Sequence, residues 1–311
     1  ADGSQSLAID DFGKVHVAFG ITRIQGIEND LPYQYLWIDG IAYWNEDMPG
    51  FSSNINALSP YGHPDSELIE DYNLIGWSQD INNNGQLDFM DDLGRYNIGL
   101  SSQPQLVIDE EEIFLVYSSV TETYSNGLKN YRHIWSRAGY FSGGTTNWHP
   151  NFKHLTSDLT HVFDECVYPA VAANSDDYLH LIYQVDTEPG IASWYQQHDY
   201  IDNQMTYLRE SKEMIVGIGQ QPEPGKQLNV AQNYPNPFQG MTRIVAETST
   251  SGSMGIKVFN PAGQVVYEEF RPLAQPGIHL FDINGHHLTK GIYFYTVSDG
   301  TASVTKKMIV D

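Results

Sequence analysis

The sequence predicts an all-β protein. Short runs in which apolar and polar residues alternate recur along its 311 residues, and this period of two is the pattern of half-buried strands. Aromatic residues make up 13% of the chain and charged residues only 18%, a composition that suits sheets. Turn residues, chiefly Gly, Pro, Asn and Asp, separate the runs.

The N-terminal part repeats one pattern, in which an apolar alternation, an acidic or Asn-containing turn and a second alternation follow one another. It occurs at residues 6–19, 104–117 and 169–183, and each copy predicts a β-hairpin. Hairpins repeated on this scale predict four-stranded β-propeller blades. The aromatic stretches that follow them would supply the outer strands, at residues 33–44, 131–148 and 191–208.

We therefore expect residues 1–218 to form a partial β-propeller-like domain of about three blades. Three blades do not close a ring, so we also expect further blades upstream of Ala1. The alternative is an irregular β-sandwich or an open stack of sheets.

One hairpin of this domain carries a further pattern. Ile-Trp-Ser-Arg at residues 134–137 leads to Ser-Gly-Gly-Thr-Thr-Asn-Trp at residues 142–148. This resembles a degraded Asp-box turn of the sialidase-like propellers, although the Asp that names the box is absent. The resemblance implies a propeller fold and not sialidase activity.

The chain changes character after this domain. Residues 219–227 are rich in Pro, Gly and Gln without apolar period, which predicts an exposed linker. At least five period-two runs follow within residues 228–311, with turns at residues 261–263 and 298–300. Short strands at this density predict a small Ig-like antiparallel β-sandwich.

Landmark residues stand in a fixed order within the C-terminal domain. It opens on Asn233-Tyr234-Pro235-Asn236-Pro237-Phe238, and Gly291, Tyr293 and Lys306-Lys307 mark its last two predicted strands. That order resembles the C-terminal sorting domain (type A) of cargo proteins of the type IX secretion system. Without the landmarks, the strand pattern alone would equally suit a module that binds a ligand or stiffens the C-terminus.

The resemblance implies a Bacteroidota-type cargo that is exported to the cell surface or the medium, with residues 1–218 as the passenger. Its implied partners are the outer-membrane translocon and a shuttle protein of the secretion machinery. After cleavage, the cargo is either released or joined to a surface glycolipid. We expect cleavage in the exposed linker at residues 219–227. No basic-then-apolar signal peptide stands at Ala1, so we expect a mature chain or a fragment.

Charge and cysteine content exclude several classes of function. The formal net charge is −23, and it belongs entirely to residues 1–227, because residues 228–311 hold six basic and six acidic residues. An acidic domain repels phosphate, so we expect no nucleic-acid partner and no membrane attachment through basic patches. The single cysteine, Cys166, has Val162 and Val167 nearby, which favours a buried, inert thiol. The sequence contains no run of about 18 apolar residues, so it predicts no membrane-spanning helix.

One loop has the spacing of a calcium site. In residues 80–91, oxygen-bearing side chains stand at positions 1, 3, 5, 9 and 12, with Gly85 at position 6, as Ca²⁺ requires in an EF-hand-type loop. With Asp rather than Glu at position 12 and no flanking helices, it looks more like the calcium loops of dockerins. We expect the ion to fix an inserted loop at residues 61–97. The predicted ligands are Asp80, Asn82, Asn84, Asp88, Asp91 and the backbone carbonyl of Gln86.

The sequence contains no catalytic motif that we could assign, so no catalytic residue is predicted. Two functions stay open. One is a non-enzymatic propeller that binds a glycan or a protein. The other is a glycan-active, sialidase-like hydrolase whose catalytic residues lie partly upstream of Ala1. We expect Glu165 to be buried and hydrogen-bonded, and histidines such as His133 and His154 to lie at strand edges or on the surface. A sugar-stacking platform could come from Trp37, Trp44, Trp135, Trp148 and Trp194, although core positions are commoner for tryptophan.

Overall fold

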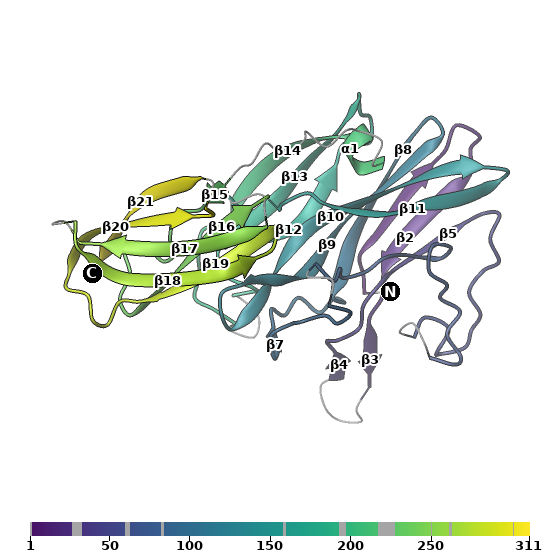
Figure 1. Ribbon diagram of the computed structural model, residues 1–311. Helices are drawn as coiled ribbons and strands as arrows, with labels where there is room; N and C mark the ends of the chain where they lie inside the picture. The colour runs from purple at the N-terminus through teal and green to yellow at the C-terminus, as the bar shows by residue number, and fades with distance from the viewer. Residues whose placement is uncertain are drawn as a thin grey trace. The chain divides into compact units, whose positions relative to one another are not determined.

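The computed structural model divides into two compact units, Ala1–Gly219 and Gln220–Asp311 (Figure 1). Almost all of its regular structure is antiparallel strand, which confirms the all-β prediction. The described part holds one short helix, α1 (Lys212–Val216), and no helix there is long and apolar enough to cross a membrane. The structure describes residues 2–26, 33–59, 63–81, 84–157, 160–192, 197–216, 228–249, 251–260, 263–300 and 302–311.

The first sheet of the N-terminal unit contains the first predicted hairpin, with Leu7 opposite Val17. Its fourth strand, β6, lies within residues 61–97, which the sequence analysis treated as an inserted loop; that stretch therefore also builds the sheet. A separate ribbon is formed by β3 (Arg23–Gln25) and β4 (Tyr33–Tyr35). The spatial order of the sheet is β1 (Gln5–Ile9), β2 (Val15–Gly20), β5 (Ile41–Asn45) and β6 (Leu74–Gly76).

Two further sheets contain the other two predicted hairpins. In each of them the strands stand side by side in chain order, apart from the short β7 of the second sheet. The second sheet has β8 (Ser101–Asp109), β9 (Glu112–Ser125), β10 (Lys129–Ser142) and β11 (Thr145–His154), with β7 (Asp92–Leu93) parallel to β10. The third sheet has β12 (Glu165–Val171), β13 (Tyr178–Asp186) and β14 (Gln204–Ser211).

The second sheet lies between two hydrophobic clusters. Along β9, Leu115 and Tyr117 pack in a cluster with the first sheet, whereas Phe114 and Val116 pack in a cluster with the third sheet. Residues of β9 alternate between the faces, so both faces of this strand are buried. The second cluster includes Cys166, which is buried as predicted.

The predicted tryptophan platform does not form among the described residues. Trp135 and Trp148 are buried in the cluster shared with the first sheet. Trp37 is exposed but stacks on Phe89, and Trp44 donates a hydrogen bond to the carbonyl of Met48. Trp194 lies outside the described residues.

The C-terminal unit consists of two antiparallel sheets around one core. Phe281 and Ile283 from one sheet and Tyr295 and Val297 from the other belong to a single buried cluster, which makes the unit a β-sandwich. The first sheet is β15 (Leu228–Val230), β16 (Met241–Thr248) and β19 (Gly277–Asn284). The second is β18 (Val265–Ala274), β17 (Gly252–Phe259), β20 (Gly291–Ser298) and β21 (Ser303–Val310).

Candidate functional site

The segment that opens the C-terminal landmarks is anchored inside the sandwich by Asn233. This side chain is 2% exposed, and its Nδ2 donates hydrogen bonds to Thr242 Oγ1 at 3.0 Å and to the carbonyl of Pro235 at 3.2 Å. Its backbone N–H donates to the hydroxyl of Tyr295 at 3.1 Å. Tyr234 remains partly exposed, and its backbone pairs with Arg243.

The same segment holds the last strand of the chain. Asn236 Oδ1 accepts a hydrogen bond from the N–H of Ile309 at 2.8 Å. The N–H of Phe238 donates to the carbonyl of Ile309 at 3.1 Å, and the N–H of Asp311 donates to the carbonyl of Phe238 at 2.9 Å. The Phe238 ring fills the core beside Gly285, where a Cβ would stand 2.5 Å from the ring. The segment with the first landmarks is therefore hydrogen-bonded to the end of the chain, directly after the last landmarks.

The remaining landmarks lie on β20 and β21, the last two strands of the chain. Tyr293 is buried and its hydroxyl donates to the carbonyl of Thr289 at 3.0 Å. Gly291, at the start of β20, has a φ of +150°, which favours glycine. In β21, Lys306 is half-buried and Lys307 is exposed, and the carbonyl of Lys307 accepts a hydrogen bond from the side chain of Gln232.

Comparison with known families decides the nature of this domain. Residues 232–311 match the family of secretion system C-terminal sorting domains. The match supports the interpretation of the chain as cargo of the type IX secretion system, and it implies an interaction with the machinery of that system. The sorting domain indicates export across the outer membrane, to the cell surface or the extracellular space.

Other comparisons add little. No curated protein matches the chain. Among solved structures, the chain is similar at 12% identity to PorZ, an essential surface component of the type IX secretion system of Porphyromonas gingivalis. The similarity covers 98% of this chain but 30% of PorZ, with a TM-score of 0.21, and carries no argument about the passenger.

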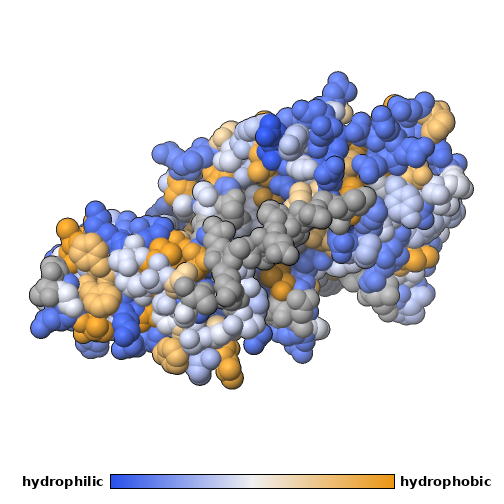
Figure 2. Space-filling model, turned by 45° about the horizontal axis from the view of Figure 1, so that its top comes forward, coloured by the Kyte–Doolittle hydropathy of each residue, from blue (hydrophilic) through white to orange (hydrophobic). Residues whose placement is uncertain are grey.

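Both units expose some apolar side chains. The passenger surface seen in Figure 2 is mainly hydrophilic, in keeping with the position of the negative charge in residues 1–227. In the sorting domain, the exposed apolar side chains include Phe270, Leu273 and Phe294.

The predicted calcium loop is partly described, since Asn82 lies outside the described residues. Asp80 accepts hydrogen bonds from the N–H groups of Asn84 and Gly85, at 3.2 and 2.7 Å. Asn84 Nδ2 donates to Asp88 Oδ2 at 2.6 Å. Two of the predicted ligand side chains, Asn84 and Asp88, therefore contact each other, while the Asp80 carboxylate bonds to backbone N–H groups of the same loop.

Two other predicted ligands lie on the surface of the loop. Gln86 and Asp91 are exposed, and the described residues hold no group of three or more His, Cys, Asp or Glu placed to bind a metal. The sequence analysis missed Glu122, which is fully buried in β9 and accepts a hydrogen bond from the N–H of Asp88 at 3.0 Å. No local pattern links Glu122 to a loop 34 residues earlier.

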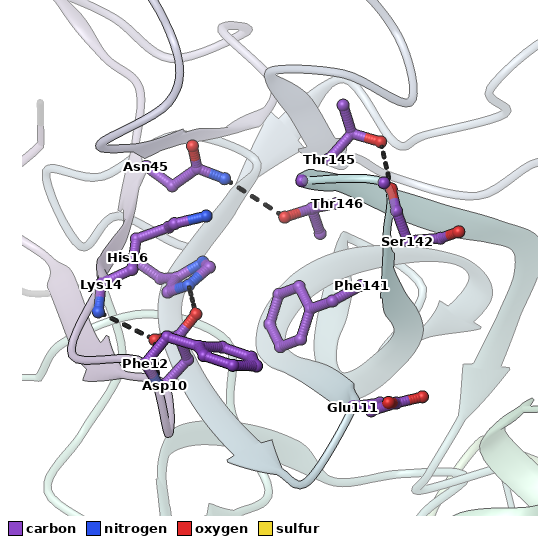
Figure 3. Close-up of a pocket in the computed structure, with 12 residues that line it drawn as sticks. Asp10, Phe12, Lys14, His16, Asn45, Glu111, Phe141, Ser142, Thr145 and Thr146 are labelled. Atoms are coloured by element: carbon purple, nitrogen blue, oxygen red, sulfur yellow. Dashed lines mark hydrogen bonds and ion pairs between the residues drawn. The ribbon is translucent and has the colours of Figure 1, made fainter.

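A pocket of about 330 Å³ lies between the tip of the β1–β2 hairpin and the β10–β11 turn (Figure 3). His16 is 1% exposed, with Nε2 3.4 Å from Asp10 Oδ2 and Nδ1 2.6 Å from the hydroxyl of Tyr43. Burial lowers the pKa of His16, which favours the neutral imidazole, and its Nδ1 shares a hydrogen bond with the Tyr43 hydroxyl. The chain of hydrogen bonds continues from Tyr43 to Thr146 and Asn45.

This network joins the hairpin to β5 and β11. Asp10 also accepts the N–H groups of Phe12 and Lys14, and Asn45 Oδ1 accepts the N–H of Asp47. Because the polar groups at the floor of this pocket bond to one another, we interpret it as a structural network rather than a ligand site.

Proposed function

We propose that this protein is a type IX secretion cargo whose passenger is a non-enzymatic binding module. The match of residues 232–311 to the sorting-domain family carries the cargo part of the proposal. The three stacked sheets of the passenger, two of them with all main strands in chain order, support the interpretation as propeller blades. The strongly negative charge of residues 1–227 favours partners that are not anionic.

Secretion of matched variants tests the proposal. The full chain and a variant without residues 228–311 would be expressed in a type IX-competent cell, and periplasm, cell surface and medium probed separately. The truncated passenger should accumulate in the periplasm. A control variant, Phe12→Ala, changes a side chain that is 90% exposed in the passenger and should be exported normally. Truncated passenger in the medium would contradict the sorting assignment.

We further propose that the loop at residues 80–91 binds one Ca²⁺ in a structural role. The spacing of the oxygen-bearing residues and the contact of Asn84 with Asp88 support this, and the buried Glu122, which accepts the N–H of Asp88, would hold the loop against β9. Attachment of the exported protein to a surface glycolipid after cleavage remains part of the proposal.

A glycan hydrolase is the second candidate function, because two buried carboxylates stand opposite each other in the register of neighbouring strands. Glu165 on β12 is the register partner of Asp186 on β13. Burial raises the pKa of both groups, and that of Glu165 to about 8, so one carboxyl can stay protonated while the other is ionised. Glycoside hydrolysis needs such a pair. Release of reducing sugar from plain or sialylated polysaccharides by the full chain would favour this candidate over a binding module.

A further inference from the structure

The passenger contains a second pocket, of about 260 Å³, next to the third sheet. Its walls come from the segment after β7, from β12 and β13, and from the chain that leads to β14. They combine aromatic rings with a carboxylate and two carboxamides. The side chains used below are Tyr96, Tyr168, Gln184, Asp186, Tyr200 and Asn203.

Tyr168 reaches this pocket because β12 is bulged. The pairing of β12 with β13 shifts between Val167 and Ala170, and Tyr168 has a φ of +54°. A bulky residue rarely adopts this conformation, and bulges commonly re-aim a side chain next to a site. The N–H of Tyr168 donates to Gln103 Oε1 at 2.8 Å, which holds the bulge against β8.

Tyr96 forms the adjoining wall and is held on several sides. Its hydroxyl accepts a hydrogen bond from the N–H of Gly190 at 3.3 Å, and the Arg132 guanidinium lies 5.4 Å from its ring centroid. The rings of Tyr96 and Tyr168 meet edge to face, with centroids 6.1 Å apart. Gly94 permits the close approach, since a Cβ there would stand 2.7 Å from the nitrogen of Gly190.

Asp186 supplies the charged group. Its side chain is 7% exposed and Oδ1 accepts the N–H of Glu188 at 2.9 Å. Among the described residues it forms no ion pair. Burial raises its pKa. A carboxylate that is largely shielded from water is stabilised most by hydrogen-bond donors that a ligand brings into the pocket.

We propose that this pocket binds one pyranose ring of a glycan. The faces of Tyr168 and Tyr200 would pack on the C–H face of the sugar, while Asp186, Gln184 and Asn203 would take its hydroxyl groups. A volume near 260 Å³ is at the small end for ligand pockets and suits a single ring. The proposal rests on the passenger being a binding module, and it names the site and the ligand class.

The test uses the full chain and free sugars. Saturation-transfer NMR would be recorded with glucose, galactose, mannose, N-acetylglucosamine and sialic acid, with an N-acetyl-lysine amide as a non-sugar probe. At least one sugar should receive saturation at its ring protons. Asp186→Asn, which keeps shape and removes charge, should weaken binding about tenfold.

Two further variants keep the test decisive. Tyr200 is 83% exposed, so Tyr200→Ala should leave the fold intact and still weaken binding, which decides the case if Asp186→Asn fails to fold. Phe12→Ala, an equally exposed aromatic residue elsewhere on the passenger, should bind like the parent protein. Absence of sugar binding, equal binding by all variants, or binding of the lysine amide alone would each overturn the proposal.

Failure here is distinguishable from failure of the proposed function. Export depends on residues 228–311 and is measured in cells, whereas sugar binding depends on the passenger and is measured on purified protein. An exported protein that bound no sugar would overturn the pocket assignment alone.

Discussion

The side chain of Asn236 accepts a hydrogen bond of 2.8 Å from the backbone N–H of Ile309, 73 residues further along the chain. Two neighbouring backbone bonds, of Phe238 with Ile309 and Asp311, surround this contact. The Pro-Asn-Pro-Phe landmark of the sorting domain is therefore a support for the edge strand β21 as well as a sequence signature.

Replacement of Asn236 should loosen β21. Asn236→Ala leaves the N–H of Ile309 without its acceptor, at a cost of about 1–2 kcal/mol. Hydrogen exchange followed by mass spectrometry on the full chain should show faster exchange at Ile309 and Asp311. The matched control is Asn229→Ala, whose side chain makes only a 3.4 Å bond to Glu247. Unchanged exchange at Ile309 in Asn236→Ala would contradict the proposed support.

A methyl group at Gly285 should destabilise the sorting domain. Its Cβ would stand 2.5 Å from the Phe238 ring and 3.2 Å from the carbonyl of Gly240, so the backbone or the ring must move, at a cost of about 1–3 kcal/mol. Gly252→Ala is the control, because its Cβ would meet only the carbonyl of Asp299 at 3.8 Å. Urea unfolding should separate the two variants; equal midpoints would show that the contact is not tight. Phe238→Leu should partly rescue Gly285→Ala.

The passenger should lose stability in weak acid because of a buried histidine pair. His133 Nδ1 lies 2.7 Å from His154 Nε2. Burial lowers the pKa of His133 well below its usual range and that of His154 to about 3, with His154, His161 and Lys153 contributing. The unfolded histidines titrate near 6.5, so below that pH the unfolded chain binds more protons and the free energy of unfolding falls.

When both histidines titrate, the free energy of unfolding should fall by about 2.7 kcal/mol for each unit by which the pH is lowered. Urea unfolding between pH 7 and pH 5 measures it. His154→Gln, which can still bond to His133, should roughly halve the slope, whereas His149→Gln on the same strand should not. A pH profile shared by all three proteins would refute the assignment.

The ionisation of Glu165 should lower the stability of the passenger as the pH rises, whereas the histidine pair lowers it as the pH falls. Burial is the main cause that raises its pKa from 4.5 to about 8, while Arg132 opposes the shift. Between these values the folded state keeps a proton that the unfolded chain has lost, so stability falls as the pH rises from 4.5 to 8. Glu165→Gln cannot ionise and should gain stability relative to the parent protein across this window, by a few kcal/mol at its upper end. Glu188→Gln is the control; equal profiles would mean that Glu165 is ionised without cost.

Calcium should raise the melting temperature of the passenger. At ten times the Kd, one site adds about 1.4 kcal/mol, or about 3–6 °C for a domain of this size. Thermal scans with Ca²⁺ and with EDTA test this. Asp88→Asn should reduce the shift, and Asp65→Asn, which changes an exposed residue outside residues 80–91, should keep it. An unchanged melting temperature together with no heat on titration would remove the site.

The features that the sequence predicted are those encoded locally. The three passenger hairpins depend on period-two alternation and a turn, and all three form. The order of landmarks around Asn233 and Lys306 was enough to recognise the sorting domain, because it can be read without knowing which strands meet.

The features that the sequence missed depend on contacts between distant strands. Tyr168 turns into its pocket through a bulge that Gln103 holds from another sheet. The histidines were expected at strand edges or on the surface, yet His133 is fully buried and lies against His154 across the β10–β11 hairpin. The alternation of apolar and polar residues shows toward which face of a strand a side chain points, but it does not show which sheet packs on that face.

The two-sided burial of β9 bears on how the passenger unfolds. In repeat proteins each unit contacts only its neighbours, and outer units can melt one at a time. Here Leu115 and Phe114, adjacent in sequence, belong to the two different hydrophobic clusters, so disruption of the middle strand reaches both outer sheets at once. The passenger should therefore melt in a single cooperative transition, despite the repetition in its sequence.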